Sequence, residues 1–235
     1  MVLKLCNMVQ MRTFIFIILV NLFLSVDSKE HGKVNRDICP TTTITLCARE
    51  VLQEIRTTAN QIHPLTLQIE QNIHRRDPNK VTLENNIIYK TTILNITFPS
   101  SKTHDQFMHM NNIDKSDLVH LIKEADYAVS YLYKSIVNLR QAETASKEDG
   151  DNALFHQVEQ LLEEGMICNY RDILHTYAEK WSSTNDIDGI EVGRTRKRDI
   201  TSCIYHTQIV ITVRLLRQWM ELINYTVDIL EKKLL

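Results

Sequence analysis

Residues 199–235 carry one apolar stripe that follows the whole segment. Its members recur at alternating spacings of three and four, the pattern of one buried face on a long helix: Ile209, Val213, Leu216, Met220, Ile223, Val227, Leu230 and Leu234. The segment contains no Gly or Pro. A helix of this length approaches about 50 Å and is not stable alone. The rest of the chain must therefore supply partner helices of similar length.

The opposite side of this segment is polar. Its members follow the same period, a turn or so around the helix: Arg217, Glu221, Asn224, Asp228 and Glu231. We therefore expect the helix to be packed on one side and solvated on the other.

Three earlier segments, near residues 44–74, 115–145 and 152–181, have the same helical period. Pro64 predicts a kink or short break in the first of them. Gly165 predicts a stop or bend in the third. With the C-terminal helix near 199–234, the chain supplies four long helices, and only 5 Gly and 4 Pro in 235 residues favour an all-α fold.

The connections between these helices are long, short and medium-long. Residues 75–113 have no sustained period, and we expect a long connection there that covers the core or forms a short strand. Only a short break around Gly150 separates the second helix from the third. This order is the one that an up-up-down-down four-helix bundle with long crossover loops requires, because parallel neighbours need connections that span the bundle.

Residues 1–28 have the pattern of a secretory signal peptide. Arg12 precedes an apolar run that begins at Phe14 and ends at Leu24, and small or modest residues follow at 26–28. The run is short for a membrane span, which takes about 20 residues, although a signal anchor remains an alternative. We therefore predict a secreted protein whose single domain covers residues 29–235, without membrane insertion of the mature chain.

Four cysteines lie beyond this segment: Cys39, Cys47, Cys168 and Cys203. An even number in a secreted chain predicts two disulfides. Cys203 and Cys47 would lie at opposite ends of antiparallel helices, beyond the reach of about 7 Å for bridged Cα atoms. Both crossed pairings join Cys203 to Cys39 or Cys47, so we expect Cys39–Cys47 and Cys168–Cys203.

Two sequons and one basic run indicate modification in the secretory pathway. Asn95 and Asn224 each begin an Asn-x-Thr sequon. Arg196, Lys197 and Arg198 end a run that is either a solvated loop or a site for a protease specific for basic residues.

The sequence contains no pattern of an enzyme site. Gly-x-Ser-x-Gly, P-loop and His-Glu-x-x-His motifs are absent, and we expect neither catalysis nor a cofactor. A zinc site would need a Cys-x-x-Cys or paired-His spacing, which is missing. Asp186 to Gly189 resemble part of a calcium loop, but this register places threonine at the first and last ligand positions, where carboxylates are needed. A net charge of -2 gives no indication of a nucleic-acid partner.

Trp219 lies beside the main stripe of the C-terminal helix, with Arg214, Arg217 and Gln218 near it. Such a tryptophan is most often at the margin of a core. The same composition is also typical of a binding hot spot, so we take these four residues as candidate receptor-binding residues.

The signal peptide, four amphipathic helices, paired cysteines and sequons together resemble a long-chain class I helical cytokine. The C-terminal helix is similar to that of the interleukin-6, leukaemia inhibitory factor and ciliary neurotrophic factor group through residues 215–219 and 227–230. The Phe-x-x-Lys of leukaemia inhibitory factor-like members is absent from 199–208. The resemblance implies a cytokine or growth factor that clusters single-pass receptor ectodomains and signals through receptor-associated kinases. It implies one receptor surface on the first and third helices and another near the start of the C-terminal helix. From the pattern of the C-terminal helix itself, we expect its polar side to be a receptor surface.

Two other classes remain open. Secreted inhibitors of pectin methylesterase and invertase are similar in their four helices and in the stretch Cys168-Asn169-Tyr170. A helical carrier of lipids or odorants would need a hollow core. A second helix parallel to the first favours the cytokine, and an antiparallel one favours the inhibitor.

Overall fold

The computed structural model describes residue 39 and residues 48–94, 98–110, 112–146, 151–178, 181–183, 187–190 and 202–233, with the backbone alone at 93, 94, 143–146, 202, 203 and 233. The helices are α2 (Ala48–Arg76), α3 (Lys80–Leu94), α4 (Lys102–Met108), α5 (Lys115–Ser146), α6 (Asn152–Leu162), the π-helical turn η1 (Glu163–Ile167), α7 (Cys168–Tyr177) and α8 (Ser202–Lys233). No described residue is in a β-strand. The all-α prediction is therefore confirmed.

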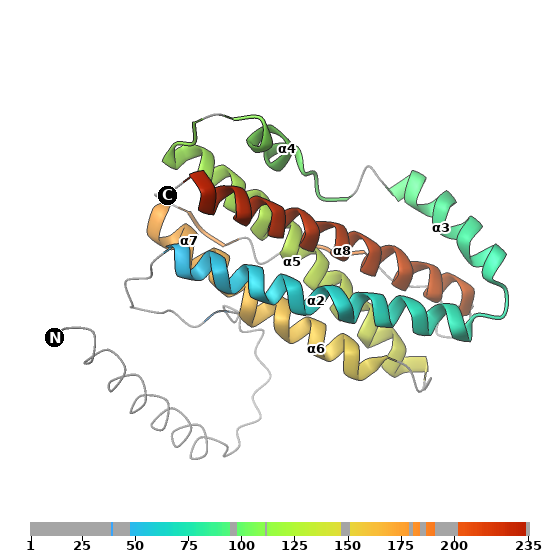
Figure 1. The fold of residues 1–235 in the computed structure, drawn as a ribbon. Coiled ribbons are helices and arrows are strands. Elements are labelled where there is room, and N and C mark those ends of the chain that lie inside the picture. Colours follow the sequence, from blue (N-terminus) through green and yellow to red (C-terminus); the bar gives the residue numbers. More distant parts are fainter. Residues whose placement is uncertain are drawn as a thin grey trace, which may run out of the picture. The chain divides into compact units, whose positions relative to one another are not determined.

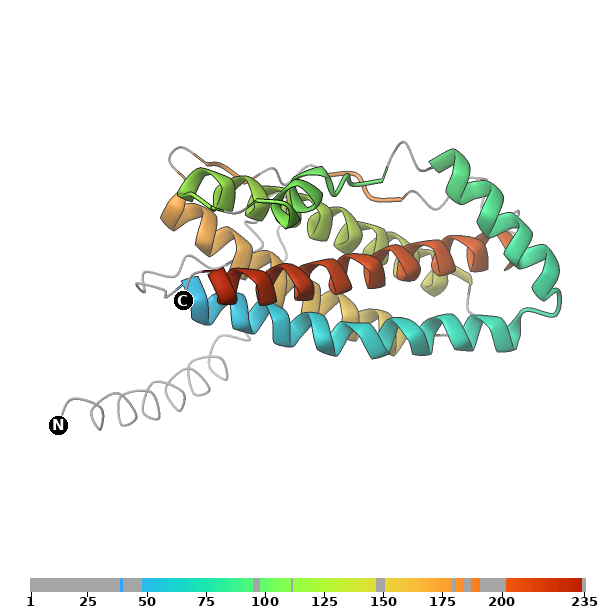
Figure 2. The ribbon, with the colours of Figure 1, turned by 45° about the horizontal axis from the view of Figure 1, so that its top comes forward.

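The first and last of the long helices, α2 and α8, lie side by side and run in opposite directions (Figures 1 and 2). Polar pairs follow their shared edge in order along both helices: Arg56 with Asp228 and Glu231, Asn60 with Asn224, His63 with Glu221, Glu70 with Arg217 and Arg214, and Asp77 with His206. The polar side of α8 is consequently not a free solvated face. It pairs with α2 over most of its length.

The segment α6–η1–α7 runs opposite to both α2 and α5. The end of α2 contacts its start, since Asn72 Nδ2 donates to Asp151 Oδ1 at 2.7 Å. On the other side, Arg140 in the later part of α5 donates to Glu159 of α6. Asp126 in the earlier part of α5 lies against Arg171 of α7. Because α2 and α5 are both antiparallel to this segment, they run in the same direction.

The four long segments share one core. Its largest fully buried side chains come from α2, α3, α4, α5 and α6: Ile55, Ile62, Ile69, Ile73, Leu83, Phe107, Leu121, Leu132, Ile136, Leu139, Phe155 and Leu162. The predicted stripe of α8 is buried from Ile209 to Leu230. α2 also continues through Pro64 without a break, so of the two expected outcomes, a kink or a short break, the break is absent.

The connection between α2 and α5 is helical, which the irregular pattern of 75–113 did not predict. α3 lies against α8, and α4 lies against α5 and α8. Asn79 begins α3, because its Oδ1 accepts a hydrogen bond from the Thr82 amide at 3.1 Å. Leu83 and Ile87 of α3 are buried, whereas Ile88 is exposed. Apolar residues on both sides of α3 remove the amphipathic period.

Residues 187–190, from the connection between α7 and α8, lie along α5. The Ile190 amide donates to Ser135 Oγ at 2.9 Å, and Asn138 Nδ2 donates to the Ile190 carbonyl at 3.2 Å. A Cβ at Gly189 would lie 2.4 Å from the Ser135 backbone nitrogen, so only glycine fits this approach. This contact explains the glycine better than a calcium loop does.

Gly165 neither ends nor breaks the third long segment, since η1 joins α6 to α7 around it. Its Cα faces α2, and a Cβ there would lie 2.6 Å from Thr58 Oγ1. The glycine therefore permits a close approach of two helices.

Gly165→Ala is expected to lower the free energy of unfolding by about 1–3 kcal/mol, because the added methyl overpacks against Thr58. Thr58→Ala in the same chain should recover much of this loss, since it removes the two nearest atoms. Urea titration of the single and double variants measures both effects. Equal stability of Gly165→Ala and the natural protein would contradict the close contact.

The structure joins Cys39 to Cys168, with their Cα atoms 5.2 Å apart. The expected pairings Cys39–Cys47 and Cys168–Cys203 are therefore wrong. Cys39 lies nine residues before α2, so the direction of α2 does not fix where Cys39 lies. Cys39 bonds Cys168 in the middle of the α6–η1–α7 segment. Cys47 and the side chain of Cys203 lie outside the described residues, and their participation in a disulfide stays a prediction.

Candidate functional site

A groove of about 1010 Å³ lies between α3 and α8. We call it the α3–α8 groove. Its lining comes from α3, from residues 98–101 and from one side of α8: Ile87, Ile88, Thr91, Thr92, Phe98, Pro99, Ser100, Ser101, Ile211, Arg214, Leu215, Gln218, Trp219 and Leu222. The lining mixes apolar side chains with hydroxyl groups and has one charged residue, Arg214. It is suited to an apolar contact with polar edges.

Trp219 lies in the groove, but only 3% of its surface is exposed. Its ring meets the ring of His104 edge to face, with ring centres 5.3 Å apart. Thus the core-margin interpretation of Trp219 is confirmed. Any binding there would use the edge of the indole and its neighbours rather than a protruding side chain.

His104 and Glu124 attach α4 to α5 behind the groove residue Trp219. Glu124 of α5 accepts hydrogen bonds from the Thr103 and His104 amides at 2.8 and 2.9 Å, and from His104 Nδ1 at 2.7 Å. Burial alone would raise the pKa of the Glu124 carboxyl, but these hydrogen bonds outweigh it and lower that pKa. The carboxylate therefore holds the first turn of α4 in place.

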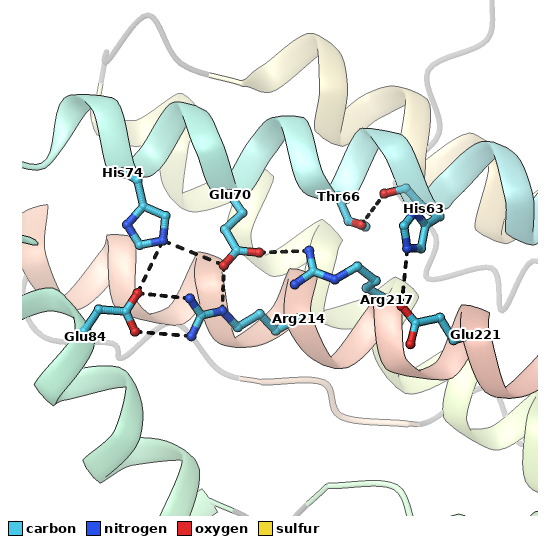
Figure 3. Close-up of polar contacts among 8 residues, drawn as sticks. All are labelled: His63, Thr66, Glu70, His74, Glu84, Arg214, Arg217 and Glu221. Atoms are coloured by element: carbon cyan, nitrogen blue, oxygen red, sulfur yellow. Dashed lines mark hydrogen bonds and ion pairs between the residues drawn. The ribbon is translucent and has the colours of Figure 1, made fainter.

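A charged cluster borders the groove where α2, α3 and α8 meet (Figure 3). Arg214 Nε donates to Glu70 Oε1 at 2.6 Å, and its Nη2 donates to Glu84 Oε1 at 3.0 Å. Arg217 Nη1 donates to Glu70 Oε2 at 2.9 Å, and His74 Nε2 lies 3.4 Å from Glu84 Oε1. Both arginines predicted to contact a receptor are thus already held by carboxylates of the same chain.

The electrostatics of Glu70 agree with this geometry. Burial alone would raise the pKa of its carboxyl, but hydrogen bonds from Arg214 and Arg217 outweigh the burial and lower it. Burial would likewise lower the pKa of Arg214, whereas Glu84 and Glu70 raise it. These shifts favour the charged forms of Glu70 and Arg214, and the bonds of Arg214 to Glu70 and Glu84 hold α3 against the α2–α8 pair.

Gln218 is the one predicted receptor-binding residue that is exposed. It lines the groove beside Arg214 and Trp219, while Arg217 points to α2. The structure therefore brings three of the four residues to one groove and directs the fourth away from it. The α3 side of the groove was not predicted, because 75–113 was interpreted as an irregular connection.

The other predicted sites have separate positions. Asn224 Nδ2 donates to Asn60 Oδ1 at 2.9 Å on the α2–α8 edge, and the hydroxyl of Thr226 in the same sequon is bonded to the Leu222 carbonyl. A glycan on Asn224 would have to rearrange this contact. Asn95, the run Arg196 to Arg198 and the predicted signal peptide lie outside the described residues.

The described side chains include no group of three or more His, Cys, Asp or Glu residues placed to hold a metal ion. Within the same part of the chain, no helix combines the length and the apolar character needed to cross a membrane.

Comparison with known proteins identifies no relative. No protein-family model matches the chain, and neither the curated proteins nor the solved structures give a significant match.

His104 makes the attachment of α4 sensitive to acid. Burial lowers the pKa of His104 below its ordinary value of 6.5, and this outweighs the opposing effect of Glu124. The unfolded chain consequently binds the proton more readily than the folded protein. The contribution of His104 to the free energy of unfolding is therefore fully present above pH 6.5, and it is lost as the pH falls from 6.5 toward the lowered pKa of His104.

The difference in unfolding free energy between the natural protein and His104→Gln should therefore narrow as the pH falls below 6.5. Urea titration at several pH values measures it. The exposed His156 of α6 gives a matched control, and the stability of His156→Gln should stay within about 0.5 kcal/mol of the natural protein. A constant difference between the natural protein and His104→Gln would contradict the burial argument.

Proposed function

We propose that this chain is a secreted helical cytokine or growth factor, which binds and clusters single-pass cell-surface receptors and triggers kinase-linked signalling. The proposal includes an up-up-down-down four-helix bundle, with α2, α5, the α6–η1–α7 segment and α8 as its helices. Residues 77–114 and 178–201 would be its two crossovers.

The observation that carries this proposal is the common direction of α2 and α5. Two consecutive helices that run in parallel need a connection that returns along the bundle. The long connection with α3 and α4 meets this need, and residues 187–190 along α5 support a second crossover. An inhibitor of the pectin methylesterase class is expected instead to have its first two long helices antiparallel.

The packed interior is a second line of support. The core side chains of α2, α5 and α8 are buried together, and the cavity lined by Leu52, Leu121 and Leu230 is only about 10 Å³. A carrier of lipids or odorants would need an interior space of several hundred Å³. A filled core and a surface groove that charged residues border are better suited to binding another protein than to carrying a small apolar ligand.

The test is a signalling assay with the full chain purified from the medium of secreting cells. Addition to a panel of cells should produce tyrosine phosphorylation of receptor-associated kinases within minutes, in a dose-dependent manner. The same preparation, reduced and heat-denatured, should be inactive. Absence of both cell binding and phosphorylation, with inhibition of pectin methylesterase or invertase, would overturn the proposal.

A further inference from the structure

α4 lies outside the four long segments, against α5 and α8 (Figures 1 and 2). Of its seven residues, His104 and Phe107 are buried, and the others are exposed or half-buried. α3 is held separately, since Arg214 of α8 binds Glu84 of α3 with two nitrogens. α4 is therefore a small element with few buried side chains, and such elements open locally at a lower free energy than the whole fold.

One carboxylate joins the start of α4 to α5. Glu124 accepts hydrogen bonds from the Thr103 and His104 amides at 2.8 and 2.9 Å, and from His104 Nδ1 at 2.7 Å. The two amides belong to the first turn of α4, where backbone N–H groups have no partner within the helix. Because the three bonds share one acceptor group, movement of α4 away from α5 would break all of them together.

The His104 ring closes the gap between α5 and α8. It lines a cavity of about 10 Å³ together with Leu121 of α5 and Ile223 and Val227 of α8. Its edge-to-face contact with Trp219 lies beside this cavity, and His104 and Trp219 are only 1% and 3% exposed. Opening of α4 would therefore admit water to an apolar gap and to the side of Trp219 that His104 covers.

The groups around the His104 ring determine what a proton does there. Glu124 of α5 and Asp105 of α4 favour the protonated ring, but burial outweighs them and lowers the pKa of His104. α8 presents an indole ring and α2 an aliphatic side chain. Tyr170 of α7 lies across the cavity, where burial raises the pKa of its hydroxyl and keeps it neutral. The closed position thus disfavours a charged imidazole.

Other charged groups of α5 face the outer part of α4. Asp117 and His120 line a second cavity, of about 340 Å³, with Lys102 and Gln106 of α4. His104 does not line this cavity, and His120 is exposed. His120 therefore provides a second histidine at the α4–α5 contact that lies outside the buried site.

We infer that α4 is a lid on the gap between α5 and α8, and that protonation of His104 in mildly acidic solution releases this lid. When α4 opens, the imidazole enters water and binds a proton with its ordinary affinity, so acid favours the open form. The open form exposes Trp219, whereas α3 and the four long segments stay in place. This inference does not depend on the proposed function.

Hydrogen exchange with mass analysis tests the lid on the full natural chain between pH 7.5 and 5. At each pH, protection is the intrinsic exchange rate divided by the observed rate. Protection of residues 102–110 should fall by at least about threefold and at most about thirtyfold, the ratio of charged to neutral imidazole at pH 5 for a pKa of 6.5. Protection of residues 80–92 in α3 and 125–140 in α5 should stay within about twofold.

Three results would overturn the inference. Constant protection of residues 102–110 over this range would show that acid does not release α4. An equal loss of protection in α3 or α5 would show that acid loosens the whole crossover or the whole fold. Complete exchange of residues 102–110 at pH 7.5 would show that α4 is not closed in neutral solution.

Variants assign the effect to single side chains. His104→Gln should remove the pH dependence of protection in α4, because glutamine does not titrate. Glu124→Gln should lower that protection by about tenfold at every pH, while unchanged protection of residues 125–140 shows that the variant is folded. His120→Gln is the matched control and should retain the full pH dependence. Loss of the pH dependence in His120→Gln but not in His104→Gln would contradict the inference, as would natural protection in Glu124→Gln.

Discussion

Replacement of both Cys39 and Cys168 by serine is expected to lower the free energy of unfolding by about 4–5 kcal/mol. The bond closes a loop of 129 residues, and a cross-link over so long a loop removes much of the entropy of the unfolded chain. It also holds the segment before α2 to the start of α7. The loss should be among the largest of any pair of substitutions in this protein.

Urea titration of the oxidised natural protein and of the double serine variant measures this loss. Mass mapping without reduction should yield one peptide pair that contains Cys39 and Cys168. A map that links Cys39 to Cys47, or a loss of less than about 1 kcal/mol, would contradict the observed bond.

Arg171→Met is expected to cost about 3–5 kcal/mol, because it leaves Asp126 buried without its charged neighbour. Arg171 is 3% exposed and Asp126 6%, and Arg171 Nε lies 3.7 Å from Asp126 Oδ1. The pair joins α5 to α7 inside the core. The double variant Arg171→Met with Asp126→Leu should recover most of the loss, since replacement of a whole buried pair by apolar residues is often neutral.

The pH dependence of the pair gives an independent check. Burial raises the pKa of Asp126 to about 6, and Arg171 only partly opposes this. The folded state therefore binds the proton more tightly than the unfolded chain, so this residue stabilises the fold below pH 4 and the contribution is lost as the pH rises through about 6. The free-energy advantage of the natural protein over Asp126→Asn should fall by up to about 3 kcal/mol over that range.

Urea titration of all three variants against the natural protein measures these effects. The exposed Lys134 of α5 offers a control, since Lys134→Met removes a positive charge in solvent. Its stability should stay within about 0.5 kcal/mol of the natural protein. A similarly small effect for Arg171→Met would show that Asp126 is not confined to a buried site.

The long helices were predictable because each has one apolar side. The stripe of α8 from Ile209 to Leu230 is buried as expected, and α5 ends within one residue of its predicted boundary. α3 was missed because its apolar residues lie on both sides. Residues 75–113 were interpreted as an irregular connection, although Asn79 within them is a residue typical of a helix N-cap, and this was the signal that could have revealed α3.

The contacts between elements were less predictable. Periodicity places Glu221 and Asp228 on the polar side of α8, but it cannot indicate that α2 presents His63 and Arg56 along the same edge. Likewise, no local pattern indicates that Glu124 of α5 caps α4, or that Cys39 reaches Cys168. These interactions depend on how distant segments pack, and the groove beside Trp219 depends on them too.

The parallel course of α2 and α5 can be measured directly, and the proposed cytokine bundle depends on it. Arg49 is exposed on α2, and His120 and Lys134 are exposed on α5. His120 and Lys134 are separated by about 21 Å along the axis of α5. Spin labels carried on unnatural amino acids would give two distances by pulsed electron resonance, Arg49 to His120 and Arg49 to Lys134. We expect the distance from Arg49 to His120 to be clearly the shorter one. A shorter distance to Lys134 would mean that the two helices are antiparallel, and it would contradict the proposal.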